Sequence, residues 1–70
     1  MIANVPTIER HVEHGTRIYV LISFPLGMDL MYTYQVYDRC EITGCTTLKR
    51  SVRTRNWSKG LRLWEDREEG

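Results

Sequence analysis

The stretch from Arg17 to Phe24 limits the fold more than any other part of the sequence, because it is rich in β-branched and aromatic residues. Such residues are typical of strands, and apolar side chains at both odd and even positions indicate a strand inside a sheet. Pro25 and Gly27 follow as turn residues. Polar and apolar residues then alternate from Leu30 to Ile42, which predicts a second strand. We therefore expect an antiparallel hairpin at the centre of a β-rich fold.

Pairing Phe24 with Leu30 gives this hairpin a consistent register and a five-residue loop. The even-numbered apolar residues of both strands then share one face, with Ile22 opposite Tyr32 and Val20 opposite Tyr34. That face is the predicted core. The other, outer face would carry an excess of apolar side chains, namely Tyr19, Leu21, Met31, Tyr37 and Trp64.

The second half of the chain continues this pattern. An odd-length loop at Thr43 to Cys45 sets Asp38 opposite Arg50, whereas a two-residue loop would turn cations into the core. A helix over Thr46 to Trp57 is the alternative, but Lys49 and Arg50 in its first turn would oppose the helix dipole. We therefore predict a strand here. A turn at Trp57 to Gly60 would then lead into a last strand that contains Leu61, Leu63 and Trp64.

The segment from Thr7 to His14 fits a short helix or a strand that turns at Gly15, and we favour the strand. The predicted fold class is therefore mostly β, a small antiparallel meander of four to five strands that can curl into an SH3-like barrel. The alternative is an α+β fold with a short N-terminal helix. Residues 1–64 form the predicted domain, and residues 65–70 form an acidic C-terminal tail.

A chain of 70 residues makes one domain with a thin core, which argues against a deep substrate cavity. The sequence contains no run of 18 apolar residues, so we expect no membrane span. Residues 1–6 lack the pattern of a secretory signal peptide, so a cytoplasmic location is expected. No glycine-rich phosphate loop is present, and nothing orients a histidine toward a cysteine nucleophile. We expect no enzymatic activity and no cofactor.

Two histidines and two cysteines raise the question of zinc. His11 and His14 are three apart, and Cys40 and Cys45 are five apart. On a strand, the two imidazoles would face opposite sides, and the cysteine spacing is wider than that of a zinc knuckle. We therefore predict reduced thiols without a bound metal.

A basic stretch offers the clearest candidate for binding, although the net charge of the chain is only +1. Residues 49–62 contain six cations and no acidic residue. With the neighbouring strand, they predict a partner-binding surface on the outer face that comprises Tyr37, Arg39, Lys49, Arg53, Arg55 and Trp57. Aromatic and arginine side chains are enriched at the centres of protein interfaces.

The predicted function is that of a small non-enzymatic binding protein that docks a protein partner on this outer face. Its size alone suggests an adaptor, an inhibitor, or an accessory factor of a phage or mobile element. A homodimer is one form that such an interface can take. The alternative function is nucleic-acid binding through the basic stripe 49–62, since arginines beside an exposed aromatic suit phosphate contact and base stacking.

Overall fold

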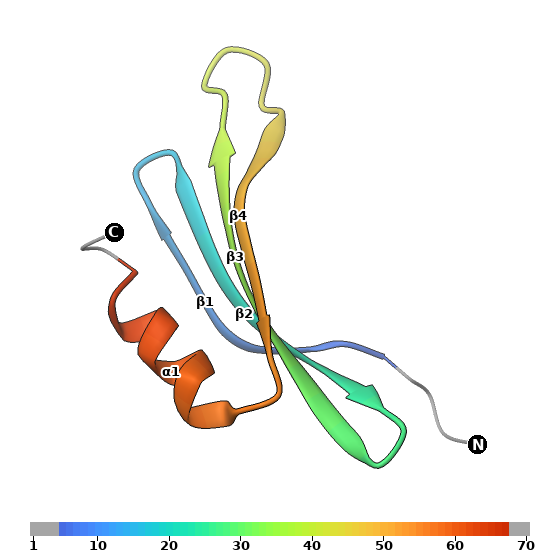
Figure 1. Cartoon of the computed structure of the whole chain (residues 1–70). Coiled ribbons are helices and arrows are strands. Elements are labelled where there is room, and N and C mark those ends of the chain that lie inside the picture. Colours follow the sequence, from blue (N-terminus) through green and yellow to red (C-terminus); the bar gives the residue numbers. More distant parts are fainter. Residues whose placement is uncertain (1–4, 68–70) are drawn as a thin grey trace.

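The computed structural model of the chain describes residues 5–67, which form one sheet and one helix (Figure 1). The strands are β1 (Thr7–His14), β2 (Arg17–Leu26), β3 (Asp29–Arg39) and β4 (Thr46–Thr54), and the helix is α1 (Trp57–Glu65). Among these residues no helix has the length and apolar character that crossing a membrane requires. Residues 1–4, part of the N-terminal segment that lacks a signal-peptide pattern, lie outside the described part of the chain. The end of the predicted acidic tail, residues 68–70, lies outside it as well.

The strands form an antiparallel meander in the order β1-β2-β3-β4, which confirms the predicted fold class. The segment Thr7–His14 is a strand, as favoured, and Thr46–Thr54 is a strand rather than a helix. The sheet stays open in the described residues, because β1 and β4 are its two edges and do not pair with each other. The predicted closure into an SH3-like barrel is therefore not observed.

The predicted register of the central hairpin is wrong by one residue. Phe24 lies opposite Met31 rather than Leu30, and Leu26 opposite Asp29 closes a two-residue turn of Gly27 and Met28. Gly27 has a φ of 66°, and no other residue type in the described chain has positive φ. This is the type II′ pattern, whose twist matches that of paired strands. A shift of one residue moves every side chain of β2 to the opposite face relative to β3.

Pro25 explains the error, because its presence suggested that β2 ends before it. In a hairpin closed by a two-residue turn, Leu26 and Asp29 form the hydrogen-bonded pair, so Pro25 and Leu30 form the next, non-hydrogen-bonded pair. The ladder with β3 thus needs no N–H from Pro25. On its other side, the pairing of β2 with β1 already ends at Ser23 and Thr7. A proline can therefore lie within β2 at no cost in hydrogen bonds.

The β3–β4 register also differs from the prediction. Arg50 lies opposite Val36, and Asp38 lies opposite Thr47, so the predicted Asp38–Arg50 pair does not form. The reason is a bulge in β4 at Lys49, between the pairs Val36–Arg50 and Tyr37–Leu48. The extra residue of a bulge reverses which side chains face each side of the sheet.

A helix replaces the predicted turn and fifth strand after β4. Asn56 caps α1, since its side-chain oxygen accepts hydrogen bonds from the backbone N–H groups of Ser58 (2.9 Å) and Lys59 (3.4 Å). Residues 57, 60, 61 and 64 have the i, i+3, i+4, i+7 spacing of a helix face, and all four are buried or half-buried. Trp64 is buried and Arg62, two residues before it, is exposed, as expected of opposite faces of a helix.

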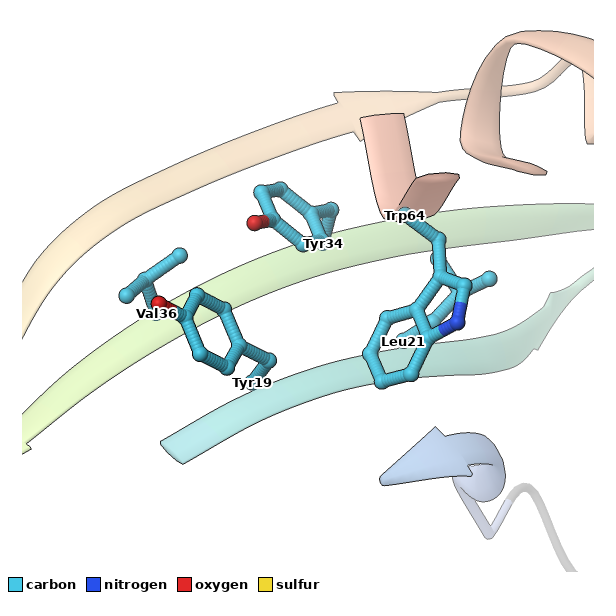
Figure 2. Packing of buried hydrophobic residues seen from close by; sticks show 5 residues of the cluster. All are labelled: Tyr19, Leu21, Tyr34, Val36 and Trp64. Atoms are coloured by element: carbon cyan, nitrogen blue, oxygen red, sulfur yellow. The ribbon is translucent and has the colours of Figure 1, made fainter. Parts of the chain in front are cut away.

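The core lies between α1 and one face of the sheet. Figure 2 shows Trp64 extending from α1 onto side chains of β2 and β3, which are Tyr19, Leu21, Tyr34 and Val36. Tyr19, Leu21 and Trp64 were predicted to lie on the outer face, and they are instead the centre of the core. The predicted core residues of β2, including Ile18 and Ile22, occupy the face that α1 does not cover. The thin two-layer shape, 42 × 29 × 15 Å, follows from this arrangement.

Candidate partner-binding face

We use the name open face for the side of the sheet opposite α1. Figure 1 shows the helix on one side of the strands and none on the other. The register places alternate residues of the strands on the open face, among them Ile18, Val20, Ile22 and Phe24 of β2, Met31, Thr33, Gln35, Tyr37 and Arg39 of β3, and Leu48 and Arg53 of β4. All four β2 residues in this set are apolar. Val20 is buried among its neighbours, whereas Ile18, Ile22 and Phe24 are half-buried and leave a hydrophobic surface without a covering layer.

A hollow of about 370 Å³ lies on the open face toward the β2–β3 hairpin. Its apolar lining comes mainly from Ile22, Phe24, Leu26 and Met31, and its polar lining includes Arg53 from β4. Beyond the hollow, at the tip of the hairpin, Met28 is fully exposed and Leu26 is 46% exposed. Leu26 lines the hollow and is exposed, so the apolar surface of the hollow reaches the end of β2.

Arg53 is the charged member of this surface. It lies opposite Thr33 on the edge strand β4, with its side chain exposed beside the apolar lining of the hollow. Within residues 5–67, no carboxylate forms an ion pair with it. An arginine beside an apolar surface is well suited to a two-point hydrogen bond with an incoming carboxylate.

Polar contacts occupy the other end of the open face. Arg39 forms an ion pair with Glu13 of β1 at 3.3 Å, and His11 lies 3.7 Å from the same carboxylate group. The hydroxyl of Tyr37 donates a hydrogen bond to Oε1 of Gln35 at 2.8 Å. Exposed ion pairs of this kind contribute little stability. They give the open face a polar rim at the end away from the hollow.

The six predicted site residues are divided between different surfaces. Tyr37, Arg39 and Arg53 share the open face, as expected. Lys49 is the exposed bulge residue of β4, and Arg55 follows the end of that strand. Trp57 was predicted to flank the outer face at a turn, which is wrong.

Trp57 begins α1 and packs on the covered side of the sheet. Its ring lies 5.0 Å from that of Tyr32, and the guanidinium of Arg10 lies 5.8 Å from its centroid. Arg50 similarly lies over Tyr34 at 5.8 Å, and Arg67 over Trp64 at 4.3 Å. These three arginines cover aromatic residues of the core region, so part of the cationic character of the chain is structural.

The basic stripe 49–62 does not form a single surface, because Arg50 and Arg53 lie on opposite faces of β4. Some of its members do approach one another. Arg53, Lys59 and Arg62 line a groove of about 380 Å³ between β4 and α1, together with Asp66. Lysine and arginine on an edge strand also discourage pairing with strands of other chains, which gives these residues a structural explanation.

The histidines and cysteines lie at separate places. His11 and His14 belong to β1, whereas Cys40 and Cys45 are exposed at the two ends of the β3–β4 loop. In the described part of the chain, no three side chains of the His, Cys, Asp or Glu type come together as a set of metal ligands.

The sequence reasoning missed residues that line the hollow, chiefly Ile22, Phe24 and Leu26. The available signal was Leu-Gly-Met-Asp at 26–29, since a glycine in the first position of a two-residue turn indicates a type II′ hairpin. With that turn, Leu26 and Phe24 belong to the strand, and their parity places them with Ile22. Comparison of the chain with protein-family models, curated proteins and solved structures found no match in any of the three.

Proposed function

We propose that this chain is a non-enzymatic binding protein that docks another protein on the open face. The observation that carries the proposal is the hydrophobic hollow beside Arg53, whose lining reaches the exposed Leu26 at the end of β2. The partner we infer presents an apolar segment to Phe24 and Met31 and a carboxylate to Arg53. A role as an adaptor or inhibitor would fit such a surface.

The size of the surface supports a specific interface. Each partner in a standard complex buries about 800 Å². The broad side of a molecule that measures 42 × 29 × 15 Å is larger than this. The hollow lies toward one end of that side, and the ion pair of Arg39 and Glu13 lies toward the other. Protein interfaces combine an apolar part with polar groups at the edge, and here the polar groups lie at the end away from the hollow.

We also propose a cytoplasmic location for this binding. Cys40 and Cys45 are exposed and not joined in a disulfide, which suits a reducing compartment.

The test begins with capture of partners from host lysate, with and without nuclease, on the immobilised full chain. Binding of the captured protein is then compared between the wild type and the variants Phe24→Ser and Arg53→Glu. Arg62→Glu is the matched control, because it makes the same charge change on α1. We expect both open-face variants to weaken binding at least tenfold, equivalent to about 1.4 kcal/mol, and Arg62→Glu to bind normally. Equal losses in all three variants, or capture abolished by nuclease, would contradict the proposal.

A second candidate, nucleic-acid binding, is favoured by the groove that Arg53, Lys59 and Arg62 line between β4 and α1. Asp66 in the same groove opposes it. On nucleic acid, alanine variants of the three cations should weaken binding by similar amounts, and affinity should fall steeply as the salt concentration rises. A protein interface centred on the hollow should lose much less affinity over the same salt series.

A further inference from the structure

Cys40 and Cys45 face each other across the β3–β4 hairpin. The register of this part of the sheet pairs Asp38 with Thr47 and Arg39 with Thr46, so Cys40 and Cys45 are the next pair along. The backbone N–H of Cys40 donates to the carbonyl oxygen of Cys45 at 2.8 Å. Directly opposed residues of antiparallel strands have Cα atoms about 4.5–5.5 Å apart. A disulfide requires a Cα separation of about 4.4–6.8 Å.

The loop between the two cysteines is folded back on Cys40. The backbone N–H of Gly44 donates to the carbonyl oxygen of Cys40 at 2.7 Å, and Gly44 supplies a φ of 78° that closes the loop. The hydroxyl of Thr43 accepts a hydrogen bond from the N–H of Cys45 at 3.3 Å. Thr43 is therefore held between the two cysteines.

The two thiols are inequivalent in this arrangement. A hydrogen bond from the Thr43 hydroxyl, and further ones from the backbone N–H groups of Thr43 and Ile42, lower the pKa of the Cys40 thiol. These donors stabilise the thiolate, which is the nucleophilic form of cysteine. Both cysteines are exposed, so a reagent can reach either one.

We propose that Cys40 and Cys45 form a reversible dithiol–disulfide site at the end of the β3–β4 hairpin, and that its substrates are small-molecule disulfides. Cys40 attacks one sulfur of glutathione disulfide, forms a mixed disulfide and releases the first glutathione thiolate. Cys45, after losing its proton, attacks the Cys40 sulfur and releases the second. The two thiol protons pass through solvent to the leaving thiolates. The protein loses two hydrogen atoms, and one glutathione disulfide becomes two glutathione molecules.

The site is distinct from the open face, so its test is independent of the proposed function. The full chain is incubated with glutathione disulfide, quenched with an alkylating agent and analysed by mass spectrometry. Cleavage after Arg39 and Lys49 releases both cysteines in one peptide. We expect this peptide to lose two hydrogen atoms and to regain them on reduction. Cys45→Ser should stop at the mixed disulfide, and Cys40→Ser should react several-fold more slowly.

Two controls separate the folded geometry from simple closeness in sequence. The first control repeats the reaction in urea. There, the effective concentration of the Cys45 thiol at the mixed disulfide on Cys40 should be about tenfold lower than in the folded chain, because the hairpin no longer holds the two residues opposite each other. The second control is Thr43→Val, which should slow the reaction of Cys40 with glutathione disulfide. In the Cys40→Ser variant, the same substitution should leave the reaction of Cys45 unchanged. Stable mixed disulfides on both cysteines of the wild type, equal rates for the two serine variants, or equal effective concentrations in the folded and urea-unfolded chains would overturn the proposal.

Discussion

Leu21 lies directly opposite Tyr34 across β2 and β3, and both side chains are buried beneath α1, with exposed fractions of 0% and 1%. Trp64 of the helix packs on the same cluster (Figure 2). This pairing determines which face of the sheet becomes the core. A shift of one residue would exchange Leu21 for Ile22 and leave the opposite face under the helix.

Leu21→Ala should therefore lower the free energy of unfolding by about 2–5 kcal/mol, because it removes a fully buried side chain and leaves a cavity. Ile22→Ala, one position along on the open face, should cost about 1 kcal/mol, since Ile22 is only half-buried. Urea denaturation of the two variants provides the comparison. If Leu21→Ala leaves too little folded protein to measure, Leu21→Val replaces it. A larger loss for Ile22→Ala than for the Leu21 variant would show that the faces are assigned the wrong way round.

Gly60 is buried on the side of α1 that packs against the sheet. A Cβ atom there would lie 3.6 Å from Cβ of Tyr32 and 3.7 Å from Cδ1 of Leu21, which are ordinary contact distances. Gly60→Ala should therefore raise the free energy of unfolding by about 0.5–1 kcal/mol through its higher helix propensity. Gly60→Leu has no room and should lower it by about 1–3 kcal/mol. Thermal or urea denaturation checks both values, and destabilisation by alanine would mean that the helix lies closer than described.

Strand identity was predictable from the sequence, because the β-branched and aromatic residues of β2 and the alternation in β3 are local features. Register was harder to predict, since it depends on whether the loop around Gly27 and Met28 has an even or an odd number of residues, and on the bulge at Lys49. Bulges have no reliable sequence signature, and the glycine turn competed with a proline that also indicated a loop. The error in register then transferred Tyr19 and Leu21 from the core to the predicted outer face.

The helix was missed because Gly60 interrupts its apolar stripe. Trp57, Leu61 and Trp64 mark the helical spacing, but glycine in the middle indicates a turn. Its role is tertiary, since a small residue lets α1 approach Tyr32 and Leu21. The candidate site was predicted only in part, and the unpredicted helix is again the reason. Arg53 and Tyr37 keep their place on the face opposite the core, whereas Trp57 moves to the covered side with the helix.

Tyr34 should make the stability of the protein fall at alkaline pH. Burial raises its pKa above the ordinary value of 10.0, against the opposing effect of Arg50, whose guanidinium lies 5.8 Å from the ring centroid. The neutral phenol is thus favoured in the folded chain. Its contribution to stability is complete below pH 10.0, the unfolded value, and is lost as pH rises through the higher folded value.

The measurement is urea denaturation on both sides of pH 10.0, together with the absorbance titration of tyrosinate. Tyr34→Phe should lose less stability than the wild type over this range and should remove the latest tyrosinate step. Tyr37→Phe, which removes a phenol from the open face instead of the core, is the matched control for the loss of a tyrosine hydroxyl. Identical alkaline profiles for the wild type and Tyr34→Phe would exclude Tyr34 as the source.

The two aromatic residues Trp57 and Phe24 should separate stability from binding. Trp57 packs against Tyr32 and the core cluster, so Trp57→Ala should lower the free energy of unfolding by about 3 kcal/mol or less, because the ring is only half-buried. Phe24 is also half-buried but lines the uncovered hollow, so Phe24→Ala should cost less stability and should weaken partner binding by about 2 kcal/mol.

Binding is measured by calorimetry under conditions where circular dichroism shows each variant to be folded. The folded Trp57→Ala protein should bind its partner with wild-type affinity, because its side chain lies on the other side of the sheet. If Trp57→Ala abolishes binding while folded and Phe24→Ala does not, the partner docks on the helix side, and the open face is not the interface.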